Sequence, residues 1–205
     1  PRLLAELGVK PVRGVIFHGF PGCGKTLLAT KIAEALDSTG EPVVVAAPQL
    51  LDKYLGGSEE KIRAAFFGDD VDQDEGQGGQ EEGGDNKVGF LRAIRCVVID
   101  EIDAIGSKRS ESGSPSGSER ARDSIVNQLL SIMDGTVKDD ERFVVLATTN
   151  RLDLIDFALL RPGRFEIAIE VVPPDAEGRR HILELHTDTA RRHRRLTDQA
   201  TKAIK

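Results

Sequence analysis

One eight-residue segment constrains the fold of this chain more than any other part of the sequence. Residues 19–26 read Gly-Phe-Pro-Gly-Cys-Gly-Lys-Thr and match the pattern GxxxxGK[ST] in full. The apolar run 14–18 before the segment predicts a short buried strand, and the apolar residues between Leu27 and Leu36 recur at helical spacing. The segment therefore lies in the order strand, glycine-rich loop, helix, which is the order that a phosphate-binding loop requires.

The residue types of the loop suit the binding of a nucleotide phosphate. Glycines allow backbone N–H groups to turn towards a phosphate, and the following helix adds the partial positive charge of its N-terminus. Lys25 can bridge the β- and γ-phosphates, and the hydroxyl of Thr26 can bind Mg²⁺. The alternative is a glycine-rich turn before an ordinary helix. We expect an ATP site formed by Phe20, Pro21, Gly22, Cys23, Gly24, Lys25, Thr26 and Leu27.

A second apolar segment, residues 96–99, runs directly into two carboxylates, Asp100 and Glu101. A parallel strand that is buried on both faces is continuously apolar, and ligands of open α/β sheets bind at its carboxyl end. We therefore expect Asp100 to bind Mg²⁺ and to contact the nucleotide. Glu101 is placed to accept a proton from an attacking water molecule. The alternative is an exposed acidic strand end.

A third apolar run, residues 143–147, is followed by two threonines and Asn150. If this strand lies beside the first two, the amide of Asn150 is close to the γ-phosphate. Asparagine is also a common turn residue, so this segment alone leaves both interpretations open.

Together with Arg161-Pro162-Gly163-Arg164-Phe165, these motifs resemble the AAA+ ATPases, in the AAA branch of that family. The resemblance implies that Asn150 is a polar sensor and that Arg161 and Arg164 are arginine fingers. Such fingers act on the nucleotide of a neighbouring subunit, so the resemblance also implies a homo-hexameric ring. The residues alone leave open that the two arginines pair with nearby carboxylates or with helix C-terminal carbonyls.

Four segments, 21–29, 40–44, 126–130 and 153–164, resemble the first ATPase domain of the N-ethylmaleimide-sensitive, vesicle-fusing subfamily. This resemblance implies a cytoplasmic ATP hydrolase that uses ATP and Mg²⁺ and disassembles SNARE complexes through an adaptor. It also implies a protein that is peripheral to membranes without spanning them. A substrate-extracting ATPase of the valosin-containing-protein type is the alternative within the family.

The resemblance assigns roles to residues outside these motifs as well. It places Gly8, Ile182 and His186 against the adenine ring, whereas ordinary packing of an amphipathic helix is the alternative for the last two. It places Tyr54 and Leu55 in the loop that grips a substrate in the central pore of the ring. The pore role rests on the resemblance, because a lone aromatic residue has no such meaning by itself.

Composition limits the remaining classes of function. The two cysteines, Cys23 and Cys96, are too few for a disulfide framework and favour a reducing compartment. No run of 18 apolar residues suggests a membrane span. The only basic cluster, residues 191–195, does not predict a nucleic-acid partner, although a nucleic-acid-handling AAA+ protein stays open. A catalytically inactive nucleotide sensor is a further alternative, but the complete set of motif residues argues against it.

Two low-complexity segments interrupt the pattern of elements. Residues 68–89 hold eight acidic residues against one lysine, which accounts for the net charge of −6 and leaves the rest of the chain near neutral. This segment is too poor in apolar residues to bury surface, so we expect a disordered acidic insert. A second loop at 107–118 is rich in serine and glycine.

The order of elements predicts an α/β P-loop NTPase with a five-stranded parallel sheet and helices on both faces. We expect one ATPase subdomain over residues 1–190 and a basic, polar tail at 191–205. Most of a helical lid, an N-domain and a second ATPase domain have no counterpart, so we expect a fragment. Strands are expected at 12–18, 42–46, 96–100, 143–148 and 166–171, and helices at 25–37, 58–67, 119–133, 155–160 and 175–186.

Overall fold

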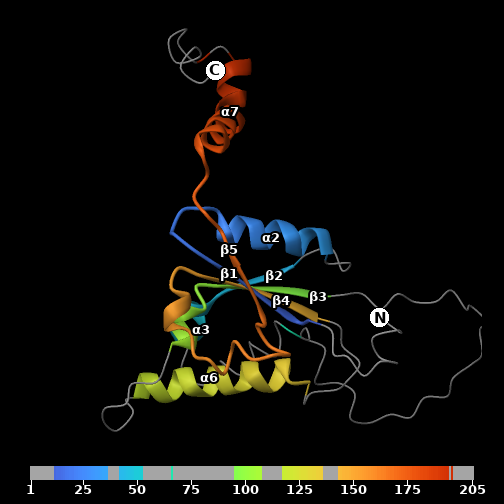
Figure 1. The fold of residues 1–205 in the computed structure, drawn as a ribbon, viewed down its shortest axis with the longest axis vertical. Helices are drawn as coiled ribbons and strands as arrows, with labels where there is room; N and C mark the ends of the chain where they lie inside the picture. Colours follow the sequence, from blue (N-terminus) through green and yellow to red (C-terminus); the bar gives the residue numbers. More distant parts are fainter. Residues whose placement is uncertain are drawn as a thin grey trace, which may run out of the picture. The chain divides into compact units, whose positions relative to one another are not determined.

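A parallel β-sheet lies at the centre of the computed structural model, which describes residues 12–36, 42–52, 66, 95–107, 117–135, 143–193 and 195. The strand order is β2-β3-β4-β1-β5, and every pairing is parallel (Figure 1). The predicted five-stranded parallel sheet is confirmed. Its strands are β1 (Gly14–His18), β2 (Val43–Ala46), β3 (Arg95–Asp100), β4 (Phe143–Thr149) and β5 (Ile167–Glu170).

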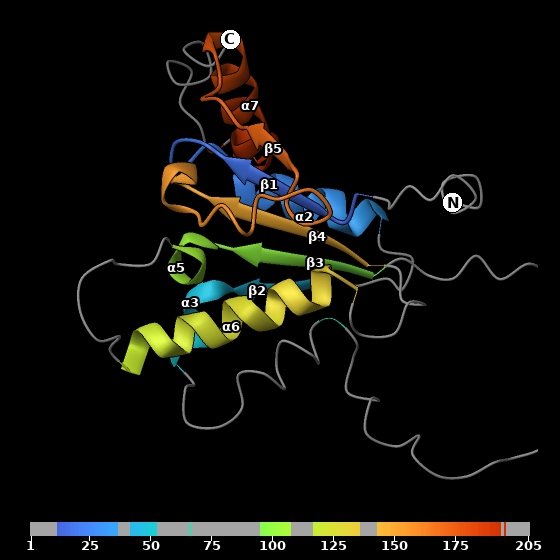
Figure 2. The ribbon, with the colours of Figure 1, turned by 60° about the horizontal axis from the view of Figure 1, so that its bottom comes forward.

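Helices cover both faces of the sheet, as predicted. Figure 1 shows α2 (Lys25–Leu36) on one face and α6 (Gly117–Met133) on the opposite face. Figure 2 shows the short helices α3 (Ala47–Asp52) and α5 (Asp103–Gly106) on the same side as α6. The sheet is therefore the middle of three layers.

The continuously apolar sequence of β3 follows from its position between two cores. Cys96 and Val98 belong to the apolar cluster under α2, which also contains Ala29. Val97 and Ile99 belong to the larger cluster under α6. Successive side chains of a strand point to opposite faces, so a central strand with a core on each side needs apolar residues at every position.

Two predicted helices have different outcomes. The helix expected at 58–67 lies outside the described residues, apart from Phe66. The helix expected at 155–160 is wrong: the structure has a 3₁₀ turn, η2 (Leu152–Leu154), followed by hydrogen-bonded turns. The carboxylate of Asp156 accepts the N–H of Ala158 at 2.8 Å, and Arg164 Nη1 donates to the Ala158 carbonyl at 2.5 Å. A helix here could not continue, because Pro162 has no N–H for the carbonyl of Ala158; the side chains of Asp156 and Arg164 bond the backbone of Ala158 instead.

The chain divides into two compact units, Pro1–Val171 and Val172–Lys205. The second unit is built on α7 (Ala176–Arg192). The predicted cap is present, because the carboxylate of Asp175 accepts the N–H of Gly178 at 2.8 Å. The helix continues past the predicted end at His186. Among the described residues, no helix is both long enough and apolar enough to cross a membrane.

Candidate nucleotide-binding site

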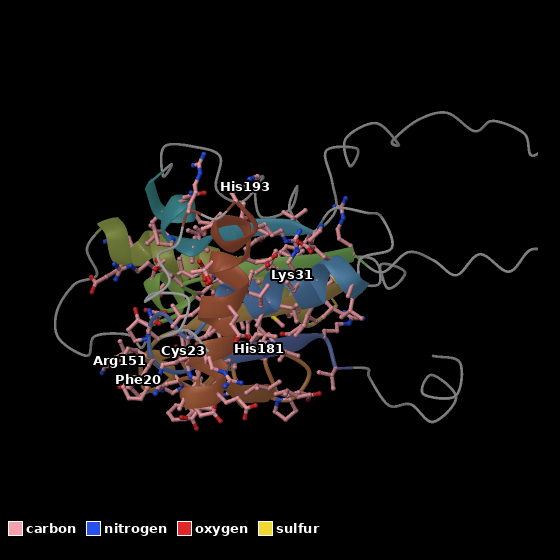
Figure 3. All side chains as sticks on the ribbon, turned by 90° about the horizontal axis from the view of Figure 1, so that it is seen from above. Phe20, Cys23, Lys31, Arg151, His181 and His193 are labelled. Atoms are coloured by element: carbon pink, nitrogen blue, oxygen red, sulfur yellow. The ribbon has the colours of Figure 1, made fainter. Side chains whose placement is uncertain are left out.

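The carboxyl ends of three adjacent strands carry the predicted site residues. β1 lies beside β4, with His18 paired to Thr149, and β4 lies beside β3. The chain leaves β1 into the loop 19–24, leaves β3 at Asp100, and leaves β4 at Asn150. Figure 3 shows Phe20 and Cys23 at the same end of the sheet as Arg151, the residue after Asn150. The expected proximity of the three motifs is therefore confirmed.

A pocket of about 450 Å³ opens at this edge of the sheet. This volume lies within the range of roughly 300–1,000 Å³ that is typical of small-molecule sites. Residues of the loop, both carboxylates and Asn150 form its walls. The pocket is lined by Pro21, Gly22, Gly24, Lys25, Thr26, Leu27, Asp100, Glu101, Thr148, Thr149 and Asn150.

The glycine-rich loop depends on backbone conformations that only glycine adopts freely. Gly19, Gly22 and Gly24 have φ angles of +137°, +78° and +87°. A Cβ atom on Gly19 would also lie 2.4 Å from the carbonyl oxygen of Val171. The loop leads straight into α2, whose first residue is Lys25. The N-terminus of a twelve-residue helix thus faces the pocket, which is a favourable place for an anion.

The side chain of Lys25 is buried, with 7% of the residue exposed. Its ammonium group donates to the backbone carbonyl of Gly19 at 3.1 Å and to that of Phe20 at 2.8 Å. A third hydrogen bond, of 2.7 Å, joins it to Oδ1 of Asn150. A buried cation needs such partners, and these hold Lys25 between the loop and the end of β4. The side chain of Phe20 is itself 68% exposed, so its contact with Lys25 is made by its backbone.

The two carboxylates are held differently. Oδ1 of Asp100 accepts a hydrogen bond from Thr26 Oγ1 at 2.8 Å and a short one from Thr148 Oγ1. Glu101 is exposed and has a φ angle of +55°, the only positive φ among the described residues other than glycine. Its N–H donates to Thr148 Oγ1 at 3.2 Å. Asp100 is thus held through its side chain, and Glu101 is held through its backbone N–H.

The donor set fits a magnesium ion that is shared with a nucleotide. Mg²⁺ prefers oxygen ligands, and in nucleotide sites it takes one or two from the protein and the rest from phosphates and water. Thr26 and Asp100 supply neighbouring oxygens on the pocket wall. Over the described part of the chain, no group of three or more His, Cys, Asp and Glu side chains could form an all-protein metal site.

The two predicted arginine fingers have different surroundings. Arg161 is exposed. Arg164 makes a bidentate pair with Asp134, with Nε 2.8 Å from Oδ1 and Nη2 2.7 Å from Oδ2. Its hydrogen bonds to Asp134 raise the pKa of Arg164 above its usual value, against the opposing effect of burial. The contacts of Arg164 therefore match the pairing with a nearby carboxylate that the residues alone left open.

The roles of the remaining predicted residues are not tested by the structure. Ile182 and His186 lie on α7, in the second unit, and both are exposed. Gly8, Tyr54 and Leu55 lie outside the described residues. Their adenine-binding and pore roles stay predictions.

Sequence reasoning missed two threonines at the end of β4. Thr148 contacts both carboxylate residues of the site. The hydroxyl of Thr149 donates to Asp103 at 2.6 Å and accepts the N–H of Arg151 at 3.0 Å. The available signal was their position, because polar residues at the end of a buried strand face the ligand edge of the sheet.

A family model described as "ATPase family associated with various cellular activities (AAA)" matches residues 15–173, which is more than half of the chain. The chain belongs to the AAA family. The resemblance on which the sequence analysis rests is thereby confirmed, and the pocket is the expected place for the nucleotide of an AAA domain.

Relatives of this AAA domain have names that refer to vesicle fusion. It is 42% identical to the vesicle-fusing ATPase of Caenorhabditis elegans over 196 aligned residues. The alignment covers 96% of this chain and 22% of the relative. It is 37% identical over 203 residues to the vesicular-fusion protein SEC18 of Saccharomyces cerevisiae, in an alignment that covers 99% of this chain and 24% of the relative. A relative with a different name, the cell division cycle protein 48 homolog of Archaeoglobus fulgidus, is 40% identical over 187 residues. That alignment covers 91% of this chain and 22% of the relative. The chain thus spans about a quarter or less of these relatives.

Proposed function

We propose that this AAA domain binds ATP with Mg²⁺ and hydrolyses it to ADP and phosphate. The observation that carries the proposal is the convergence, in one pocket, of a buried lysine at the start of α2, two carboxylates at the end of β3 and an asparagine at the end of β4. Membership of the AAA family supports the same chemistry.

The binding step uses the loop and Lys25. The phosphates enter at the N-terminus of α2, where backbone N–H groups and the helix dipole favour negative charge. Lys25 exchanges its hydrogen bonds to the loop carbonyls for bonds to β- and γ-phosphate oxygens, so a cation that is already desolvated meets the negative charge. Thr26 and Asp100 hold Mg²⁺, which neutralises charge on the phosphates when it is bound.

The hydrolytic step uses Glu101 and Asn150. Glu101 accepts a proton from the water molecule that attacks the γ-phosphorus, while the bond to the β-phosphate oxygen breaks. Asn150 contacts Lys25 at 2.7 Å, so its amide lies beside the group that binds the γ-phosphate. This position suits a residue that orients the water molecule or the phosphate.

At the level of the whole protein, we propose that hydrolysis drives the disassembly of SNARE complexes through an adaptor, at membranes but from the cytoplasm. The names of the vesicle-fusing and vesicular-fusion relatives support this role. A homo-hexameric ring with Arg161 and Arg164 at the neighbouring nucleotide completes the proposal. The 40% identity to the cell division cycle protein 48 homolog favours extraction of other protein substrates as the second candidate.

Purified full-length protein tests the two levels separately. Wild-type protein and a Glu101→Gln variant are mixed with ATP, Mg²⁺, an adaptor and a SNARE complex labelled with a fluorescence donor and acceptor. We expect the wild type to release phosphate and to separate the labels, and the variant to do neither. Phosphate release without separation of the labels would contradict the SNARE role and favour the second candidate. Absence of phosphate release from the wild type would contradict hydrolysis itself.

A further inference from the structure

Thr148 links the two carboxylate residues of the pocket to the central sheet. It is the sixth residue of β4, and only 2% of it is exposed. Its hydroxyl donates a short hydrogen bond to Oδ1 of Asp100 and accepts the N–H of Glu101 at 3.2 Å. Its backbone carbonyl accepts the N–H of Ile102 at 3.0 Å. One residue of β4 therefore binds three consecutive residues at the end of β3.

The conformation of Glu101 explains why such anchoring matters. A φ angle of +55° is in the left-handed region, which is unfavourable for a residue with a Cβ atom. Strained conformers of this kind persist where the surrounding structure holds them, and they are common at active sites. The hydrogen bonds from the N–H groups of Glu101 and Ile102 to Thr148 hold both ends of this turn.

The two hydroxyls on Asp100 are not equivalent. Thr26 is exposed in the loop–helix junction and belongs to the residues that bind the ligand. Its hydroxyl has lone pairs besides the proton that it donates to Asp100, so it would be able to bind Mg²⁺ as well. Thr148 is buried in the sheet. Asp100 is therefore held from two sides, by a residue of the loop–helix junction and by a residue of the sheet.

We propose that Thr148 is a positioning residue, whose hydroxyl, oriented by its bond to Asp100, holds the backbone of Glu101 for hydrolysis. The proposal rests on the proposed ATPase activity. Thr148 acts through Glu101, so its loss lowers turnover more than ATP affinity. A misplacement of about 1 Å at a catalytic group costs on the order of 10²-fold in rate, which sets the scale of the effect.

The test compares Thr148→Val, which removes the hydroxyl, with Thr148→Ser, which keeps it, in the full-length protein. We expect Thr148→Val to lower kcat about 10- to 100-fold, with ATP affinity within about 2-fold of the wild type, and Thr148→Ser to restore most of the loss. Thr30→Val is the matched control. The hydroxyl of Thr30 donates to the carbonyl of Thr26 at 2.8 Å within α2 and touches neither carboxylate, so kcat should not change.

A double-mutant cycle with Glu101→Gln identifies the residue through which Thr148 acts. Single-turnover reactions followed over hours measure the slow residual cleavage in the Glu101→Gln protein. We expect Thr148→Val to lower this residual rate less than about 2-fold, because the carboxylate that Thr148 positions has already been removed. An equal loss in both backgrounds would overturn the inference.

Other outcomes separate this inference from the function on which it rests. Wild-type turnover in Thr148→Val would overturn the inference alone. A parallel loss of ATP affinity and turnover, or a Thr148→Ser protein no better than Thr148→Val, would also overturn it, since Thr148 would then be a structural residue. A wild-type protein without any turnover would overturn the proposed function and this inference with it.

Discussion

The ammonium group of Lys25 lies 2.7 Å from Oδ1 of Asn150, although the two residues are 125 positions apart in the sequence. This contact joins the phosphate loop to the end of β4. Lys25 is buried and has three acceptors, of which Asn150 is the only one outside the loop. If Lys25 binds the γ-phosphate as proposed, the amide of Asn150 lies beside that phosphate, and we expect Asn150 to act on the reaction more than on binding.

The first prediction concerns Asn150→Ala. We expect kcat to fall about 10²-fold, as for the loss of one preorganised hydrogen-bonding group. ATP affinity should stay within a few-fold, because the N–H groups of the loop and Lys25 itself can still bind the phosphates. Phosphate-release kinetics and a fluorescent nucleotide titration on the same samples measure the two quantities. A loss of affinity as large as the loss of kcat would place Asn150 in ground-state binding instead.

The second prediction separates Arg161 from Arg164. Arg161 is exposed, so Arg161→Ala should leave the fold intact while lowering the ATPase rate of the assembled protein about 10³-fold, as expected for a finger supplied by a neighbour. Arg164→Ala removes the pair with Asp134 and the bond to the carbonyl of Ala158. It should therefore loosen the chain around residues 157–165 as well as lower the rate.

Amide hydrogen exchange over residues 157–165 measures this difference. We expect faster exchange in Arg164→Ala and wild-type exchange in Arg161→Ala. Mixing Arg161→Ala subunits with Lys25→Ala subunits is the control for action between subunits, because each supplies what the other lacks. Unchanged exchange in Arg164→Ala would show that the pair with Asp134 does not hold this segment.

The third prediction concerns the two cysteines. Cys96 is completely buried in β3, whereas Cys23 is partly exposed in the phosphate loop. A maleimide should therefore label Cys23 first, and bound ATP should slow the labelling because the phosphates occupy the same loop. Peptide mass spectrometry with and without ATP locates the adduct, and Cys23→Ser is the control. Labelling of Cys96 before Cys23, or equal labelling with ATP present, would contradict the placement of the loop.

The sequence predicted the features whose signal is local. The phosphate loop is encoded by residues 19–26, and the two-sided burial of β3 is visible in its unbroken apolar run. The sheet follows from the alternation of strands and helices. Each of these signals lies within a window of about ten to twenty residues, which is the range over which periodicity carries information.

These local signals do not predict contacts between residues that are far apart in the sequence. Nothing near Arg164 in the sequence indicates that Asp134 is its partner, and nothing near Thr148 indicates its bonds to Asp100 and Glu101. The turns after η2 have the same cause. The carbonyl of Ala158 is bonded by Arg164, a residue outside the segment whose pattern predicts the helix.

The central claim is that this pocket binds ATP through the loop and hydrolyses it through Glu101. The most direct measurement is the ATP affinity and turnover, in the presence of Mg²⁺, of Lys25→Ala and Glu101→Gln in the full-length protein. Phosphate contacts act in the ground state and the water-activating carboxylate acts in the transition state. We predict that Lys25→Ala abolishes binding, whereas Glu101→Gln binds ATP like the wild type without turning it over. An equal loss of affinity in both variants, or wild-type turnover in Glu101→Gln, would contradict the account.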